Sequence, residues 1–197
     1  MATSDTKWNN LLKFVCNFSD TTDFDLKLFY QLVCRYTIEK STVQSGSTLL
    51  HFAALGEESL LLKKLIALSP KEMINAENER GETPLHWACQ SGNLDSVKLL
   101  IQYGGNTFCA DVDRNSILHW CVNAGHYKVV KFLLEKDYVY INAKNKDGKT
   151  CLDICVDDED YEMALILLKY AECETISSSL GRMKKSSTEL LKLENLL

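Results

Sequence analysis

The chain has 197 residues, 46% of them hydrophobic and 25% charged, and its formal net charge is −5. These proportions are ordinary for a globular domain, and the acidic balance argues against a general nucleic-acid binder, whose binding surface must be basic. No apolar stretch approaches the roughly 20 residues that span a bilayer, and the first residues lack the basic start and apolar core of a secretory signal. We therefore expect an intracellular protein, cytoplasmic with the nucleus as the alternative, that has no transmembrane segment and binds no nucleic acid.

The first 40 residues contain two apolar stretches with helical spacing, residues 8–16 and 24–34. Displacing the pattern of the later residues back by 51 − 16 = 35 positions aligns Cys16 with His51. Residues 1–40 are therefore expected to form two helices that repeat, in degenerate form, the unit that follows them. As the first member of an array, such a pair would cap one end of the stack.

Residues 41–172 carry one motif four times. Its clearest copy is residues 81–89, which read Gly-Glu-Thr-Pro-Leu-His-Trp-Ala-Cys. The histidine of this motif, or the aspartate that replaces it in the last copy, recurs after 35, 33 and 34 residues, at His51, His86, His119 and Asp153. A period of about 33 residues that carries Thr-Pro-Leu-His is typical of ankyrin repeats. Residues 41–172 therefore resemble the ankyrin repeat family.

A second apolar run follows each motif, and its apolar residues recur three and four positions apart, as in an amphipathic helix. Polar segments with turn-forming residues separate the units; Asp147 and Gly148 close one of them. Each unit thus reads as turn, helix, loop, helix, and no single unit can enclose a core. The predicted fold is all-α: an ankyrin repeat solenoid of helix-turn-helix repeats joined by hairpin-like loops, with Leu100 and Leu133 in its core.

Each first helix begins after a residue that suits an N-cap: Thr48, Thr83, Ser116 and Thr150. In the second copy Pro84 occupies the first helical position, where its missing N–H does no harm. The resemblance implies that the histidine of the motif bonds backbone groups and ties adjacent turns together, and we expect this role rather than catalysis or metal binding. Asp153, which replaces the histidine in the last copy, suggests a terminal unit.

Eight cysteines raise the question of disulfides or a zinc site. Cys89, Cys121 and Cys155 occupy positions that are alanine in the first copy, where a reduced cysteine behaves as a small hydrophobic residue. Cys151 and Cys155 lie four residues apart on one predicted helix, but no second Cys or His pair at ligand spacing accompanies them. We expect free thiols in a reducing compartment, and no metal or cofactor.

Four large apolar residues occupy one position of the four copies: Phe52, Trp87, Trp120 and Ile154. Tryptophan is common in interface hot spots, so a protruding column of such residues could anchor a partner. The family has a core leucine at this position, and we expect the column to be buried between repeats.

Residues 173–197 break the pattern. They form a Ser-rich segment, a capping-box sequence at residues 186–189 and a short Leu-rich helix at residues 190–197. Two interpretations stay open: the helix covers the last repeat, or it begins a linker or coiled coil of a longer protein. We expect a monomeric array unless this helix pairs.

Catalysis is not expected, because the chain has no Gly-x-x-x-x-Gly-Lys-Ser/Thr, no Gly-x-Ser-x-Gly and no His-Glu-x-x-His motif. The resemblance implies a noncatalytic protein-interaction module or scaffold that binds a protein on the concave face made by the hairpin tips and the first helices. The alternative is a regulatory or targeting domain of a larger multidomain enzyme, GTPase regulator or lipid-transfer protein.

The candidate partner-binding positions match the variable surface of the family: Glu79, Arg80, Glu82, Gln90, Asp113, Asn115, Asn123, Lys146 and Asp157. Acidic residues are in slight excess, at Glu79, Glu82 and Asp113, so the partner is expected to carry a basic segment. Asn75 and Asn142 occupy a hairpin position at which ankyrin-like proteins can be substrates of an asparaginyl hydroxylase. Hydrogen bonding of each Asn within its own turn is sufficient to explain both residues.

Overall fold

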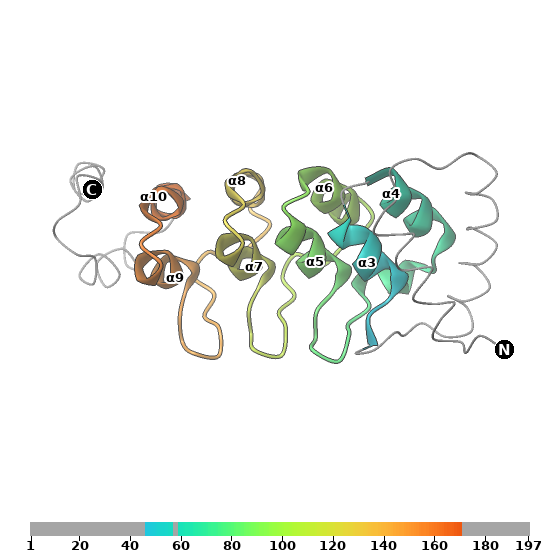
Figure 1. The fold of residues 1–197 in the computed structure, drawn as a ribbon, viewed down its shortest axis with the longest axis horizontal. Coiled ribbons are helices and arrows are strands. Elements are labelled where there is room, and N and C mark those ends of the chain that lie inside the picture. The colour runs from blue at the N-terminus through green and yellow to red at the C-terminus, as the bar shows by residue number, and fades with distance from the viewer. Residues whose placement is uncertain (1–45, 57–58, 171–197) are drawn as a thin grey trace.

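The described part of the chain, in a computed structural model, is residues 46–56 and 59–170 (Figure 1). The helices expected at residues 8–16, 24–34 and 190–197 lie outside these ranges, and so do the proposed N-terminal cap and the Ser-rich segment.

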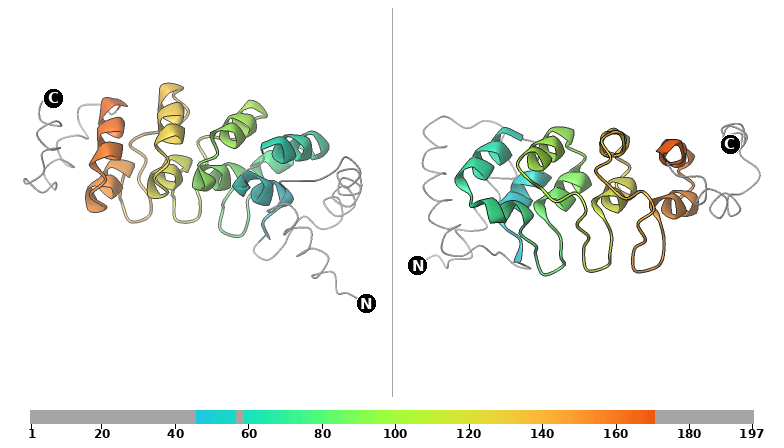
Figure 2. Two further views of the ribbon diagram at one scale, coloured as in Figure 1. Left: turned by 45° about the horizontal axis from the view of Figure 1, so that its top comes forward. Right: turned by 180° about the vertical axis from the view of Figure 1, so that it is seen from behind.

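The described helices form four consecutive pairs, here called the first to fourth repeats. They are α3 (Leu49–Leu55) with α4 (Ser59–Leu68), α5 (Pro84–Ser91) with α6 (Leu94–Gln102), α7 (Ile117–Asn123) with α8 (Tyr127–Glu135), and α9 (Cys151–Asp157) with α10 (Tyr161–Tyr170). A short 3₁₀-helix, η2 (Lys71–Asn75), follows α4. Figure 1 shows the pairs stacked along the long axis, and Figure 2 shows the same order from two other directions. The predicted all-α solenoid is confirmed.

Two rows of helices run along the stack. Helices α3, α5, α7 and α9, the inner helices, lie next to loops that all project to one side, and α4, α6, α8 and α10, the outer helices, lie on the other side (Figure 1). The projecting loops are hairpins: residues 75–82, 108–115 and 142–149 precede the second, third and fourth repeats. In the described residues, an isolated antiparallel bridge joins Ala110 and Ser116.

The inner helices begin where the sequence predicts. Thr48, Thr83, Ser116 and Thr150 are the N-cap residues, each in an extended conformation, and each forms a capping box with the histidine or aspartate three positions later. Pro84 is the first helical residue of α5. The motif thus fixes both where each inner helix starts and which side chain caps it.

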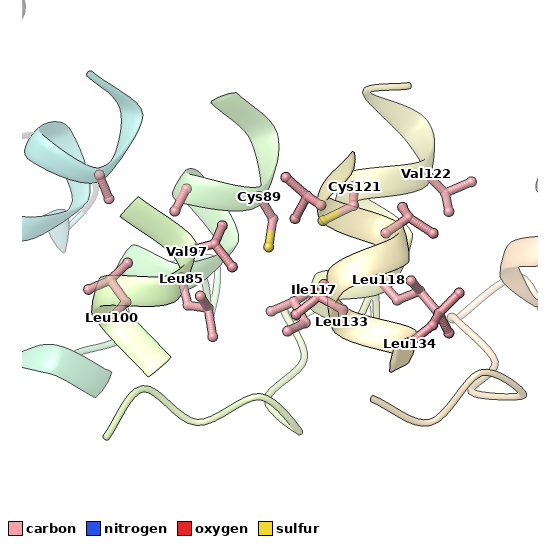
Figure 3. Packing of buried hydrophobic residues seen from close by; sticks show 14 of the residues in the cluster. Leu85, Cys89, Val97, Leu100, Ile117, Leu118, Cys121, Val122, Leu133 and Leu134 are labelled. Atoms are coloured by element: carbon pink, nitrogen blue, oxygen red, sulfur yellow. The ribbon is translucent and has the colours of Figure 1, made fainter. Parts of the chain in front are cut away.

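The core is continuous from one repeat to the next (Figure 3). The buried side chains of the second repeat and those of the third belong to one cluster, and all are fully buried: Leu85, Cys89, Val97 and Leu100 in the second, and Ile117, Leu118, Cys121 and Leu133 in the third. Since burial of apolar area supplies most of the stability of such a stack, each repeat depends on its neighbours. The cysteines take part as expected of small hydrophobic residues, and Cys89, Cys121, Cys151 and Cys155 are all buried.

Candidate interaction surface

The hairpin tips share one organising side chain. In the second-repeat hairpin, Asn78 Oδ1 accepts hydrogen bonds from the backbone N–H groups of Arg80 and Glu82, at 2.9 and 3.0 Å. Asp111 and Asn145 make the equivalent bonds in the next two hairpins. An Asn or Asp that bonds the backbone two residues ahead mimics a backbone turn, so each tip is held by its own sequence.

Backbone hydrogen bonds also join neighbouring hairpins. The N–H of Val112 donates to the carbonyl of Arg80 at 2.9 Å, and the N–H of Lys146 donates to the carbonyl of Asp113 at 2.8 Å. The two bonds lie at the same position of successive repeats. They set the spacing of the second, third and fourth hairpins, which therefore form an ordered row.

The motif histidines tie each repeat to the next. His51 Nδ1 accepts from the backbone N–H of Thr48 at 3.0 Å, so Nε2 carries the proton and donates to the carbonyl of Glu82 at 2.9 Å. His119 bonds the carbonyl of Lys149 in the same way at 3.2 Å. Burial lowers the pKa of all three motif histidines, and that of His86 to about 4, which keeps the ring neutral and both nitrogens committed to structure.

Asp153 performs only part of this role in the fourth repeat. Its Oδ2 accepts from the backbone N–H and the hydroxyl of Thr150, at 2.9 and 2.8 Å, which completes the capping box. A carboxylate has no N–H, so it cannot donate to a carbonyl of a following turn as a histidine does.

A fourth histidine, which the repeat motif does not include, supplies a second tie. His126 precedes α8, and its Nε2 lies 2.8 Å from the carbonyl of Gln90 in the previous repeat. Its ring lies against Gly92, where a Cβ atom would collide with it. In the sequence, this contact is indicated only by the glycine at position 92. His126, the residue whose ring requires that glycine, is 34 residues away, so only the fold identifies the pair.

The inner helices present two parallel columns of side chains. The first is the column of large apolar residues, Phe52, Trp87, Trp120 and Ile154, which pack on the core and are partly exposed. The second lies one helical turn further on and is exposed: Leu55, Gln90, Asn123 and Asp157. We call these two columns the inner-helix face. The burial expected for the first column is thus partial.

Ring contacts and hydrogen bonds hold the first column in place. Trp87 packs edge-on against Phe52, with ring centroids 5.1 Å apart. Its indole N–H donates to Glu82 Oε2 at 2.8 Å, and that of Trp120 donates to Asp111 Oδ2 at 3.1 Å. Each indole is therefore fixed to a carboxylate of its own hairpin, and the exposed part of the ring has one orientation.

The predicted contact residues divide into three groups. Glu79, Arg80, Asp113 and Lys146 lie at the hairpin tips, and Gln90, Asn123 and Asp157 lie together in the exposed column of the inner helices. Asn115 is half-buried between hairpins, where its amide donates to Asp111 and its oxygen accepts from Asn145. Glu82 is the exception.

Glu82 is not available at the surface, and treating it as an exposed contact position was wrong. Its side chain is only 4% exposed, and its carboxylate accepts from Trp87 and from Asn78 Nδ2 while pairing with Arg80 at 3.2 Å. A buried carboxylate requires such partners, because an unpaired charge inside a protein costs several kcal/mol. Its role is to join the hairpin to α5.

Charges at the tips largely pair with one another. Lys146 Nζ lies 3.3 Å from Asp113, and Lys149 Nζ lies 2.9 Å from Asp157. With Glu82 paired to Arg80, the acidic excess of the tips is smaller than the sequence suggested.

The two asparagines considered for hydroxylation lie on the hairpin stems and are exposed. Asn75 does not bond within its own turn: its amide donates to the carbonyl of Gly104, and its oxygen accepts from the N–H of Asn106, in the next repeat. The bonding within the turn is made three residues later, by Asn78 and Asn145. Hydroxylation stays a prediction, which mass spectrometry of the protein from its native cell would test.

Within residues 46–56 and 59–170, no group of three or more His, Cys, Asp and Glu side chains is placed to hold a metal ion. No helix in the same ranges is both long and apolar enough to cross a membrane.

A family model described as "Ankyrin repeats (3 copies)" matches residues 22–111 and 103–177. Human "Transient receptor potential cation channel subfamily A member 1" is 31% identical over 120 residues, 61% of this chain and 11% of that protein. Human "Ankyrin repeat domain-containing protein 63" is 36% identical over 84 residues, 41% of this chain and 22% of the relative.

"Target of rapamycin complex 2 subunit AVO2" of Saccharomyces cerevisiae is 27% identical over 167 residues, 80% of this chain and 38% of that protein. The chain thus spans between about a tenth and two fifths of the length of these relatives. The family match extends over most of the sequence and covers the four stacked helix pairs. The chain belongs to the ankyrin repeat family.

Proposed function

We propose that this chain is a noncatalytic protein-interaction module or scaffold, which binds a protein partner across the inner-helix face and the adjoining hairpin tips. The observation that carries the proposal is the pair of columns on the inner helices, in which oriented, partly exposed rings lie beside exposed polar side chains. The general role is common to the ankyrin repeat family; the face and the residues are specific to the proposal.

The rings suit a binding role because they are already ordered. Trp87 and Trp120 are held by their hairpin carboxylates, so a partner that covers them gains apolar contact without first immobilising flexible side chains. Tryptophans with this combination of an apolar face and a fixed polar edge are common among residues that dominate binding energy. Gln90 and Asn123, one turn away, can supply hydrogen bonds that orient the partner.

The chemistry of the partner follows from the charges that remain exposed. At the tips, Arg80 pairs with Glu82 and Lys146 with Asp113, so little net charge is left. Asp158, the C-cap residue of α9, is exposed and adds an acidic side chain at the fourth repeat. A basic segment of the partner is therefore expected at the fourth repeat, with an apolar segment over the two tryptophans.

A double substitution tests the face. Gln90→Arg with Asn123→Arg adds bulk and positive charge to the exposed column, and both side chains are exposed, so the fold is expected to be retained. The matched control is Gln102→Arg with Glu135→Arg, at equivalent exposed positions of α6 and α8 on the outer helices. Full-length wild-type and variant proteins serve as bait in extracts of the native cell, and recovered proteins are quantified by mass spectrometry.

The proposal predicts at least one protein that the wild type and the outer-helix control recover equally and that the inner-helix variant loses. If every recovered protein binds all three baits equally, the inner-helix face is not the binding surface.

The second candidate is a regulatory or targeting domain of a larger enzyme, GTPase regulator or lipid-transfer protein. The observation that favours it is that the matched relatives are much longer than the region they share with this chain. A natural reading frame that continues past Leu197 into a catalytic domain would support it. A cytoplasmic or nuclear location belongs to both candidates, and cell fractionation tests it.

A further inference from the structure

One hairpin differs from its neighbours on the face turned away from the repeat interior. In the third-repeat hairpin, side chains alternate along residues 108–112, as they do in an extended strand. Cys109 is half-buried and Asp111 is buried, whereas Phe108 is 53% exposed, Val112 is 57% exposed and Ala110 is also exposed. Three successive outward positions of this hairpin are therefore apolar.

The same three positions are polar in the hairpins on either side. They are Asn75, Glu77 and Glu79 in the second repeat, and Asn142, Lys144 and Lys146 in the fourth. All six side chains are exposed. The apolar character of the third hairpin is thus not a requirement of the fold, because its neighbours adopt the same conformation with charged residues.

An aromatic residue of the next repeat extends the apolar surface. Tyr140 is 71% exposed, the largest exposure of any large hydrophobic side chain in the described residues, and its ring lies 4.7 Å from that of Phe108. Phe108, Ala110, Val112 and Tyr140 together are called the apolar strip. Water-exposed aromatic and aliphatic side chains that cluster in this way mark interaction sites in folded proteins.

The strip lies between opposite charges. Glu77 and Glu79 are on the hairpin that precedes it, and Lys144 and Lys146 are on the hairpin that follows it. Hydrogen bonds from Val112 to Arg80 and from Lys146 to Asp113 keep the three hairpins in fixed register. The exposed side chains therefore run acidic, apolar, basic along the stack, and Lys146, which also lies 3.3 Å from Asp113 within its own chain, remains largely exposed.

Such an order is self-complementary. A two-fold rotation about an axis along the third hairpin reverses the direction of the stack and keeps the direction of the hairpins. The apolar strip of one copy then faces that of the other. At each end, Glu77 comes opposite Lys144 and Glu79 opposite Lys146 of the second copy. A single patch that satisfies itself in this way is the requirement for an isologous dimer.

We propose that two copies of this chain associate through the apolar strip, as a two-fold dimer whose flanking Glu and Lys side chains pair across the interface. The dimer replaces the monomeric state expected from the sequence. It leaves Gln90 and Asn123 outside the contact, so it is independent of the binding role proposed for the inner-helix face. Its apolar centre supplies the affinity, and the charged flanks fix the antiparallel direction.

The first test removes the centre of the strip. Sedimentation velocity of the full chain over a dilution series measures the dimer dissociation constant. Phe108→Ser is expected to raise it about tenfold or more, the equivalent of about 1.4 kcal/mol. The control is Leu60→Ser on α4, where the side chain is 54% exposed but lies outside the strip, and the constant is expected to stay at the wild-type value. Since both side chains are largely exposed, both variants are expected to fold.

The second test exchanges the charges. Glu77→Lys with Glu79→Lys, and separately Lys144→Glu with Lys146→Glu, places like charges opposite each other at both ends, and each variant alone is expected to be monomeric. An equimolar mixture of the two restores opposite charges at both ends and is expected to form a one-to-one heterodimer. A partner other than a second copy would not produce this pattern.

A wild-type chain that remains monomeric at every concentration overturns the proposal. It is also overturned if the wild type dimerises but the charge-exchanged variants dimerise equally well alone, or if their mixture stays monomeric. In each of these cases the binding role of the inner-helix face is unaffected, because the extract experiment with Gln90→Arg and Asn123→Arg reads it out separately.

Discussion

The indole N–H of Trp87 donates a 2.8 Å hydrogen bond to Glu82 Oε2, and this bond fastens the second-repeat hairpin to its own inner helix. The third repeat has the same connection from a different position: Trp120 donates to Asp111, four residues earlier in the hairpin than the equivalent of Glu82. In both repeats a hairpin carboxylate accepts the indole hydrogen bond, but the acidic residue stands at a different position of the hairpin. A carboxylate that resembles a surface charge in the sequence is, in the fold, the support of a partly exposed ring.

Removing this support is expected to destabilise the protein. Glu82→Ala leaves the indole N–H of Trp87 and the amide N–H of Asn78 without their acceptor, at an expected cost of about 1–3 kcal/mol in the free energy of unfolding. Urea denaturation measures the change. The control is Glu79→Ala, which removes the same charge from an exposed side chain and is expected to stay within about 0.5 kcal/mol of the wild type. Equal stability of the two variants would show that Glu82 is not a structural residue.

The buried histidines make stability depend on pH. Burial holds the pKa of His86 at about 4, against 6.5 for the unperturbed group. The unfolded chain therefore binds more protons than the folded one between these values. The contribution of the neutral, buried His86 to the free energy of unfolding is complete above pH 6.5 and declines as the pH falls. At pH 5 the loss from this one residue is about 2 kcal/mol.

Denaturation midpoints measured between pH 7 and pH 5 check this expectation. His86→Gln is expected to be less stable at pH 7 but to lose less on acidification than the wild type. A variant whose stability falls with pH as steeply as that of the wild type would contradict the assignment.

The architecture could be predicted because the sequence contains four copies of one helix-turn-helix unit. An N-cap Thr or Ser and a His or Asp three positions later start each inner helix, and the recurrence of this pair every 33 to 35 residues left no competing fold. The histidine tie was also predictable, since its donor and its acceptor lie at fixed positions of successive repeats.

What the sequence did not reveal is which residue of an equivalent set is buried. Ser47, Glu82, Asn115 and Lys149 share one position, yet they range from fully buried to exposed. The difference depends on whether a partner such as Trp87 reaches the side chain. That contact joins a hairpin residue to an inner-helix residue, so it depends on the folded geometry of the repeat. His126 escaped notice for a similar reason, since its partners lie in the preceding repeat.

Core truncation is expected to be costly in the middle of the stack. Leu100 and Leu133 are fully buried at equivalent positions of α6 and α8. Replacement of either by Ala should lower the free energy of unfolding by about 2–5 kcal/mol, which combines lost transfer energy and a residual cavity. The control is Leu60→Ala, an exposed leucine on α4, with an expected change below about 1 kcal/mol. Thermal unfolding that is the same for all three variants would refute the assigned helix phase.

One strained residue offers a stabilising change. Arg114 has a φ of 60°, at the hairpin position where the neighbouring repeats have Gly81 and Gly148 with φ of 69° and 75°. A side chain in this left-handed region costs about 1–2 kcal/mol, and glycine removes that cost. Glycine also raises the conformational entropy of the unfolded chain, which offsets part of the gain. Arg114→Gly is therefore expected to raise stability by about 0.5–1 kcal/mol in urea denaturation. Lys144→Gly, on a stem without positive φ, is expected to do the opposite.

The contact between Gly92 and His126 can be isolated from backbone strain. Gly92 and Gly148 have nearly the same left-handed φ, 72° and 75°, but a Cβ at Gly92 would meet the imidazole of His126, whereas nothing lies within 4 Å of one at Gly148. Gly148→Ala should therefore cost only the strain of about 1–2 kcal/mol, and Gly92→Ala should cost clearly more.

A double-mutant cycle completes the argument. His126→Ala removes the obstacle and the bond to Gln90, so alone it should cost about 1 kcal/mol. In the background of Gly92→Ala, however, it also relieves the collision, and the double variant should be more stable than the sum of the single changes by about 1 kcal/mol. Urea denaturation of the four proteins provides the measurement. Strictly additive costs would mean that the imidazole moves aside freely and that its position on Gly92 does not connect the second and third repeats.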